Sequence, residues 1–147
     1  MDENKSRIIF DRFKTALARK YIQPYYQPVI RTSTRQLCSF EALARWIDPE
    51  IGTIFPDEFI PVLERESLIH LLDAEILRQV CARIRSAIAS GETPVPVSVN
   101  LSRLDFTLCD IFSVVNGIVS DYEIPHEYLC LEITESVMAE ETTAATT

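Results

Sequence analysis

The sequence predicts an α/β fold, more specifically part of a (β/α)8 barrel of the TIM type. Segments rich in apolar and β-branched residues alternate with segments of helical periodicity, an order typical of parallel βαβ units. Each predicted strand has one apolar face and one polar or mixed face, whereas a doubly wound sheet buries both faces. The 147 residues amount to roughly half of a barrel, which takes about 250.

The predicted elements follow one another with short connections. Residues 1–20 form an amphipathic lead-in helix, because Ile9, Phe13, Ala16 and Leu17 recur at helical spacing between charged residues. Strands are predicted at residues 25–31, 38–46, 94–100 and 128–134, and further helices at 56–66, 69–89 and 106–119. Pro56 suits a first helical turn, and Gly91 suits the end of the long helix.

Composition excludes several classes of protein. The net charge of −8, from 22 acidic against 14 basic residues, argues against a surface that coats DNA or RNA. We find no signal peptide and no apolar run long enough to cross a membrane. The four cysteines lie far apart without a C-x-x-C pair. We therefore expect a reduced, cytoplasmic protein.

The polar strand faces carry the candidate site. Alternation puts Glu41, Leu43 and Arg45 on one face of their strand, and Asn100 and Glu132 on the corresponding faces of the next two. In a barrel such residues reach the mouth at the carboxyl ends of the strands. Two carboxylates and an amide are hard oxygen donors that suit Mg²⁺, Mn²⁺ or Ca²⁺. Alternatively, the two glutamates face solvent at a sheet edge and the asparagine caps a helix.

Several motifs in a fixed order resemble the EAL-domain family of cyclic-di-GMP phosphodiesterases, over about residues 25–135. They are YYQPV at 25–29, FEALARW at 40–46, the G-x-x-x-P-x-x-F-I run from Gly52 to Ile60, Glu64 followed by Leu68 and Ile69, VNLS at 99–102 and LEITES at 131–136. Ala44 is a mild departure, since the family often has EALLRW.

The resemblance implies a (β/α)8 barrel whose first strand is antiparallel, and hydrolysis of cyclic-di-GMP to linear pGpG with two divalent metals, Mg²⁺ or Mn²⁺. It implies that Glu41, Asn100 and Glu132 are metal ligands and that Gln27, Leu43 and Arg45 contact the dinucleotide. Glu135 would hold the loop that follows its strand.

The family continues after LEITES into a strand bearing D-D-F-G, which completes the metal pair, and later supplies a lysine, a glutamate and a glutamine. None of these can be placed here. We therefore expect residues 21–147 to be the N-terminal portion of an EAL domain and the chain alone to be inactive. Exposed barrel edges would favour a homo-oligomer. The alternatives are a degenerate EAL domain that senses cyclic-di-GMP or binds a protein, and a purely structural half-barrel.

Overall fold

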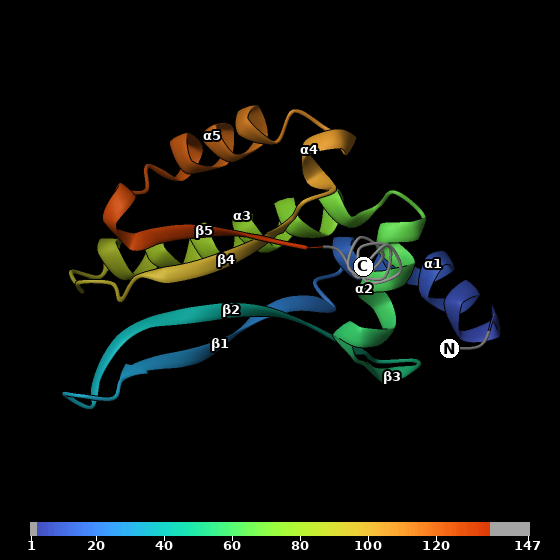
Figure 1. Cartoon of the computed structure of the whole chain (residues 1–147), viewed down its shortest axis with the longest axis horizontal. Helices are drawn as coiled ribbons and strands as arrows, with labels where there is room; N and C mark the ends of the chain where they lie inside the picture. Colours follow the sequence, from blue (N-terminus) through green and yellow to red (C-terminus); the bar gives the residue numbers. More distant parts are fainter. Residues whose placement is uncertain (1–2, 136–147) are drawn as a thin grey trace, which may run out of the picture.

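A computed structural model describes residues 3–135 as a mixed five-stranded sheet with packed helices (Figure 1). In chain order the elements are α1 (Glu3–Ala18), β1 (Ile22–Arg31), β2 (Gln36–Asp48), β3 (Gly52–Ile54), α2 (Pro56–Arg65), α3 (Ile69–Ala89), β4 (Val97–Ser102), α4 (Asp105–Leu108), α5 (Ile111–Tyr122), the 3-10 turn η1 (His126–Tyr128) and β5 (Leu129–Thr134). Within these residues every helix is too short or too polar to cross a bilayer.

The strand order is β1-β2-β4-β5, with β3 also paired to β2. The first strand, β1, is antiparallel to β2, as predicted. The pairs β2–β4 and β4–β5 are parallel, which the βαβ pattern required. Only residues 40–42 of β2 pair with β4, so the hairpin of β1 and β2 diverges from the rest of the sheet (Figure 1).

The boundaries differ from the predicted ones where local chemistry decides. The third predicted strand begins at Val97 rather than at residue 94, since Pro94 and Pro96 have no N–H to donate. The helix predicted at 106–119 is two helices, because Cys109 is extended and the Asp110 side chain caps a new helix at the N–H of Ser113. The three-residue strand β3 was not predicted.

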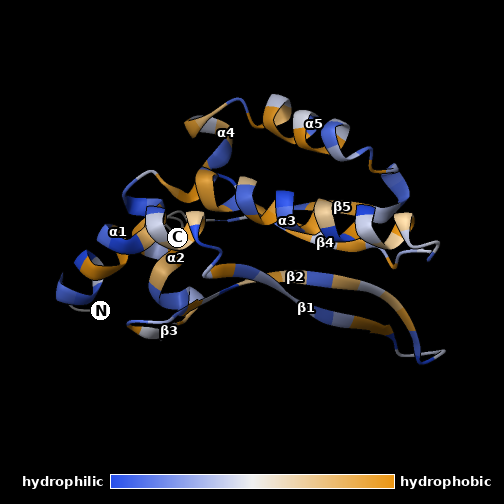
Figure 2. Cartoon of the chain, turned by 180° about the vertical axis from the view of Figure 1, so that it is seen from behind, coloured by the Kyte–Doolittle hydropathy of each residue, from blue (hydrophilic) through white to orange (hydrophobic). Residues whose placement is uncertain are grey.

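The hydrophobic core lies between α3 and the apolar face of the sheet. Figure 2 shows α3, which carries both hydrophobic and hydrophilic residues, lying beside the largely hydrophobic β4. Val97, Val99 and Leu101 of β4 are buried there against the apolar stripe of α3. At the carboxyl end of β2 the core continues around Trp46, which contacts the rings of Phe13 in α1 and Phe59 in α2. Trp46 thus packs outward against two helices.

A buried ion pair joins α1 to the end of β2. The Arg12 guanidinium donates from Nε and Nη2 to the two Asp48 oxygens, at 2.9 and 2.8 Å. Asp48 also accepts hydrogen bonds from Trp46 Nε1 at 3.2 Å and from the backbone N–H groups of Glu50 and Ile51. Burial alone would raise the pKa of Asp48, but the hydrogen bonds, led by that from Arg12, outweigh burial and hold the pKa below its usual value.

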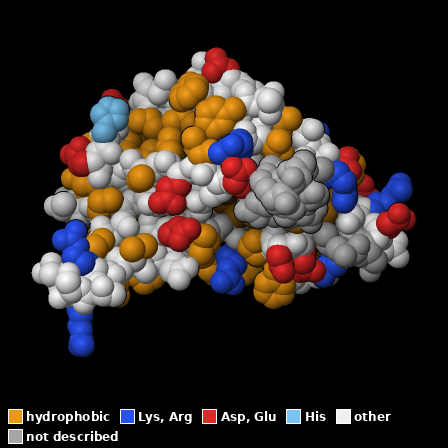
Figure 3. Space-filling model, viewed as in Figure 1, with side chains coloured by type: hydrophobic (Ala, Val, Ile, Leu, Met, Phe, Trp, Pro, Cys, Tyr) orange, Lys and Arg blue, Asp and Glu red, His pale blue; other side chains and the backbone are white. Residues whose placement is uncertain are grey.

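The outer face of β5 is the exception to the predicted burial. Alternation predicts that Leu129, Leu131 and Ile133 pack against helices, yet Leu131 is 36% exposed and Ile133 is 56% exposed. Figure 3 shows hydrophobic side chains gathered on the upper left of this view, where α5 and β5 lie in Figure 1. Among the described elements, α3 packs on β1, β2 and β4, and α5 packs on α3, whereas β5 is contacted chiefly by β4 and by the turn η1.

We predict that Asp48→Ala lowers the free energy of unfolding by about 3 kcal/mol, because it leaves the Arg12 guanidinium without its buried partner. The loss should be measured by urea unfolding at pH 7. It should shrink as the pH falls below about 4, since a lowered carboxyl pKa contributes stability that is lost on protonation. Glu50→Ala removes an exposed partner of the same arginine and should cost under about 1 kcal/mol. Equal losses for the two variants would contradict the prediction.

Candidate functional site

The polar face of the sheet brings together the residues that alternation selected. Gln27 lies opposite Glu41 in the β1–β2 ladder. Glu41 lies beside Ser98 of β4, and one step along β4 Asn100 lies beside Glu132 of β5. Residues that are aligned across a sheet point to the same side. Four strands therefore contribute polar side chains to one face. Asn100 and Glu132 lie two residues before the ends of β4 and β5, whereas Glu41 lies in the middle of β2 rather than near its end as predicted.

One contact ties two of the predicted metal ligands directly. The Asn100 side-chain Nδ2 donates to Glu41 Oε1 at 3.3 Å, across the three-residue β2–β4 pairing. Both side chains are half-buried, whereas Glu132 is exposed. The strand register places Glu41, Asn100 and Glu132 on the same side of the sheet.

Arg45 is held by an aromatic ring rather than by a carboxylate. Its guanidinium carbon lies 5.3 Å from the centre of the Tyr25 ring, a cation–π arrangement. Among the described residues no carboxylate lies within ion-pairing distance of Arg45. The guanidinium donors therefore remain available to an anionic ligand.

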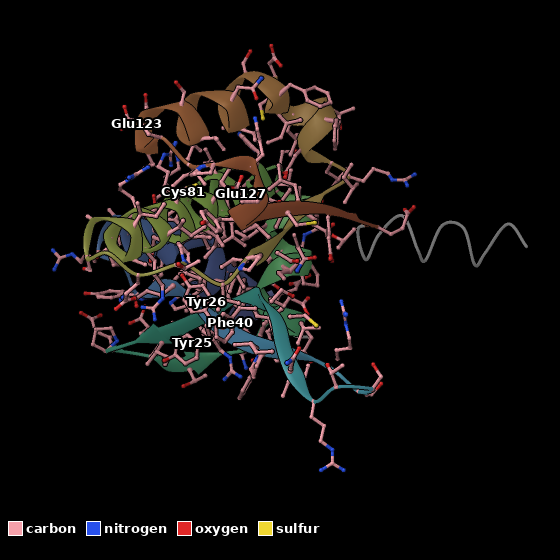
Figure 4. All side chains as sticks on the ribbon, turned by 90° about the vertical axis from the view of Figure 1, so that its left-hand side faces the viewer. Tyr25, Tyr26, Phe40, Cys81, Glu123 and Glu127 are labelled. Carbon is pink, nitrogen blue, oxygen red and sulfur yellow. The ribbon has the colours of Figure 1, made fainter. Side chains whose placement is uncertain are left out.

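The neighbouring Tyr26 points the other way. Figure 4 shows it beside Phe40, and the two rings meet edge to face at 6.3 Å. Arg83 of α3 lies over the Tyr26 ring at 5.1 Å. Alternation along β1 therefore gives Tyr26 to the core side of the sheet and Tyr25 to the polar side.

A pocket of about 310 Å³ opens where β2 and β4 separate. Leu43, Arg45 and Asn100 line it from the strands, and Phe55 and Pro56 line it from the start of α2. Residues of α3, among them Leu72, Asp73 and Ile76, complete its wall. Three of the predicted site residues thus share one concavity with side chains that were not predicted.

Asp73 belongs to a buried pair of carboxyl groups with Asp105. Asp105 is 0% exposed and Asp73 is 8% exposed. Asp73 Oδ2 accepts the backbone N–H of Ser102 at 2.8 Å, whereas neither Asp105 oxygen accepts a hydrogen bond from an N–H or O–H donor. Burial raises the pKa of both groups, and the neighbouring Asp105 carboxyl raises the pKa of Asp73 further. Burial therefore favours the protonated forms of these two carboxyls.

Glu135 lies at the end of β5 and reaches back to the turn after β4. Its Oε1 accepts from Arg103 Nη2 at 2.8 Å, an exposed ion pair. The backbone N–H of Arg103 also donates to the carbonyl of Thr134. These contacts join the carboxyl ends of β4 and β5. The predicted role of Glu135 in the following loop concerns residues 136–147, which lie outside the described part of the chain.

The donor set matches a hard divalent metal in type but not in number. Glu41, Asn100 and Glu132 offer carboxylate and amide oxygens, which Mg²⁺ and Mn²⁺ favour. Within residues 3–135, however, no three His, Cys, Asp or Glu side chains lie close enough together to hold a metal. Further ligands are needed to complete such a site, as the missing D-D-F-G segment implied.

Sequence reasoning missed Asp73, Asp105, Phe55 and the role of Tyr25. A signal for Asp73 was present, because it falls on the apolar stripe of α3, between Leu72 and Ile76. A charged residue on a buried stripe requires a partner. Its partner Asp105 lies 32 positions away, and no local pattern connects the two.

The fold and site define a class: a barrel-type α/β domain with polar residues of β1, β2, β4 and β5 on one face of the sheet. The sequence model of the EAL domain matches residues 11–147, and the chain belongs to that family. An uncharacterized protein of Sinorhizobium fredii is 42% identical over 126 residues, which are 86% of this chain and 15% of that protein. The bifunctional diguanylate cyclase/cyclic di-GMP phosphodiesterase MucR of Pseudomonas aeruginosa is 30% identical over 123 residues, 84% of this chain and 18% of MucR.

Solved structures of the family agree with the fold. The MucR phosphodiesterase in complex with c-di-GMP superposes with a TM-score of 0.78 at 28% identity, covering 93% of this chain and 56% of that one. The Xanthomonas citri FimX EAL domain in complex with c-di-GMP gives a TM-score of 0.75 at 17% identity, covering 97% and 54%. The chain thus spans about half of these structures, and the prediction of a partial barrel is confirmed. It is part of an EAL domain related to cyclic-di-GMP phosphodiesterases.

We predict that Asp105→Asn raises the free energy of unfolding at pH 7 by about 1–3 kcal/mol, because the amide donates to Asp73 and removes a buried acceptor without a donor. Raised carboxyl pKa values reduce stability as the pH rises through them, so the gain should vanish in acid below about pH 4. Chemical unfolding across this range measures it. Asp121→Asn changes an exposed carboxylate of α5 and is the control. Its free energy of unfolding should stay within about 0.5 kcal/mol of the wild-type value. A loss of stability at pH 7 for Asp105→Asn would contradict the predicted cost of a buried carboxyl without a donor.

Proposed function

We propose that the chain is the N-terminal portion of a cyclic-di-GMP phosphodiesterase domain, which hydrolyses the dinucleotide to pGpG with two Mg²⁺ or Mn²⁺ ions. The observation that carries the proposal is the hydrogen bond of 3.3 Å between Asn100 and Glu41, with Arg45 on the same face of β2 and without a carboxylate partner among residues 3–135. The similarity to the phosphodiesterase MucR supports the choice of substrate.

Arg45 binds a phosphate of the dinucleotide. A guanidinium offers up to two parallel N–H donors to a phosphate, and Tyr25 restricts the side chain to one position. Leu43, which lines the same pocket, supplies apolar contact to a base. Gln27 lies across the ladder from Glu41 and contacts the dinucleotide through its amide.

Glu41, Asn100 and Glu132 hold the divalent metal together with ligands from the rest of the domain. When bound, such a metal lowers the pKa of a water and neutralises charge on the phosphoryl oxygens. The hydrogen bond from Asn100 fixes the Glu41 carboxylate, so one Glu41 oxygen is oriented before any ligand arrives. Glu135 draws the ends of β4 and β5 together through Arg103, which positions Asn100 and Glu132.

The chain by itself contributes an incomplete set of ligands and is inactive as a hydrolase. Binding and turnover are therefore separable here. Arg45, Leu43 and Gln27 are all present and bind the dinucleotide weakly. A sensor without turnover would have no chemical need for Glu41, Asn100 and Glu132 together, which favours the enzyme over the degenerate sensor.

We predict that Arg45→Ala weakens binding of cyclic-di-GMP to the chain about 10- to 150-fold, the range for losing a hydrogen bond to a charged group. Titration calorimetry with Mg²⁺ present measures it. Arg45→Lys keeps the charge but loses the two parallel N–H donors of the guanidinium. Its affinity for cyclic-di-GMP should fall between those of the wild type and Arg45→Ala. Arg31→Ala, an exposed arginine at the far end of the hairpin, is the control and should bind as the wild type does. Unchanged affinity in Arg45→Ala would exclude the proposed phosphate contact.

We also predict self-association through β5. Three described strands have a free edge, and β3 among them is only three residues long. Of the two longer ones, β1 carries Pro24 and Pro28, which discourage pairing, whereas β5 has no proline and exposes Leu131 and Ile133. Light scattering at micromolar concentration should give the mass of a dimer or a higher oligomer. Ile133→Lys should lower that mass, and Thr32→Lys in the hairpin turn should not. A monomeric wild type would contradict the prediction.

A further inference from the structure

Phe55 occupies the N-cap position of α2, where its side chain cannot do what a cap does. Its backbone has the extended geometry of an N-cap, with φ −86° and ψ 152°. Its carbonyl accepts the N–H groups of Glu58 and Phe59 at 2.8 and 3.1 Å. Ser, Thr, Asp and Asn are preferred here because their side chains accept an N–H of the first turn. A phenyl ring has no acceptor, and no side-chain cap bond forms.

The other half of a capping box is in place. Glu58, three residues later, accepts the backbone N–H of Phe55 through Oε1 at 3.0 Å and pairs with Lys5 of α1. In the full box a Ser or Thr at the cap and a Glu at this position satisfy each other's N–H groups. The start of α2 thus has the sequence of a capping box except at Phe55.

Packing does not explain the phenyl ring either. Phe55 is 53% exposed, whereas Phe59, one turn later, is 0% exposed within the core. Among the described residues no other aromatic ring contacts that of Phe55. Departures from local sequence preference without a packing gain occur chiefly at functional sites.

The surroundings of the ring indicate what it binds. Phe55 lines the pocket of about 310 Å³ together with Leu43, Arg45 and Asn100. An exposed aromatic face beside an unpaired guanidinium matches a nucleotide, whose base stacks on the ring while its phosphate binds the cation. We propose that Phe55 is a specificity-determining residue on which a guanine base of the bound nucleotide stacks. This rests on the proposed function for the identity of the ligand, cyclic-di-GMP.

Replacing Phe55 separates a binding role from a structural one, because the two predict opposite changes. Phe55→Ser completes the capping box and should raise the melting temperature by about 2–4 °C. The same variant should weaken binding of cyclic-di-GMP about 5- to 150-fold, the loss typical of removing one base–aromatic stack. Phe55→Trp should keep the affinity. In NMR spectra the guanine H8 signal should shift upfield on binding to the wild type and to Phe55→Trp, but not to Phe55→Ser.

Phe112→Ser is the matched control, since Phe112 is 69% exposed on α5 and lines no part of this pocket. It should leave binding unchanged. Titration with 5′-GMP as a second probe distinguishes the two proposals. If cyclic-di-GMP fails to bind the wild type but GMP binds and Phe55→Ser abolishes its H8 shift, the stacking role stands and the proposed dinucleotide substrate does not. If Phe55→Ser binds cyclic-di-GMP as tightly as the wild type, or if neither probe binds the wild type, the stacking role is overturned.

Discussion

The Asp48 carboxylate is the contact on which the arrangement of this chain depends. Five donors converge on it, from the Arg12 guanidinium, from Trp46 and from two backbone N–H groups. A buried charge is stable only when it is paired in this way. Since β2 pairs with β1, β3 and β4, fixing the end of β2 fixes the middle of the sheet. The same carboxylate sets the turn into β3, and beyond β3 lies the start of α2, which lines the pocket.

Strand alternation then determines the site. Once the apolar residues of β2 and β4 face α3, Glu41, Arg45 and Asn100 must face the other side. The sequence is enough to predict this face, the order of elements and the ligand candidates, because a period of two is a local property. The antiparallel first strand was implied only by the family resemblance, and the β1–β2 ladder confirms it.

Other features depend on contacts between distant residues, and no local pattern contains them. The pocket exists because β2 and β4 pair through three residues and then separate. The Asp73–Asp105 pair joins α3 to the turn after β4, and the raised pKa values of the two carboxyls arise only once both groups are buried. The exposure of Ile133 likewise follows from which helices cover which strands. By contrast, the sequence could have predicted the break before α5, because Asp110 and Ser113 have the spacing of an N-cap residue and the residue whose N–H it accepts.

The antiparallel direction of β1 determines where α1 lies relative to the candidate site. Because β1 runs against the other strands, its first residues lie at the same end of the sheet as the carboxyl ends of β2 and β4, and so does α1 (Figure 1). Arg12 couples that helix to Asp48, which lies three residues from Arg45 along one strand. The Arg12–Asp48 ion pair therefore connects α1 to the strand whose Arg45 lines the pocket, and a single carboxylate lies between the first helix and the candidate phosphate site.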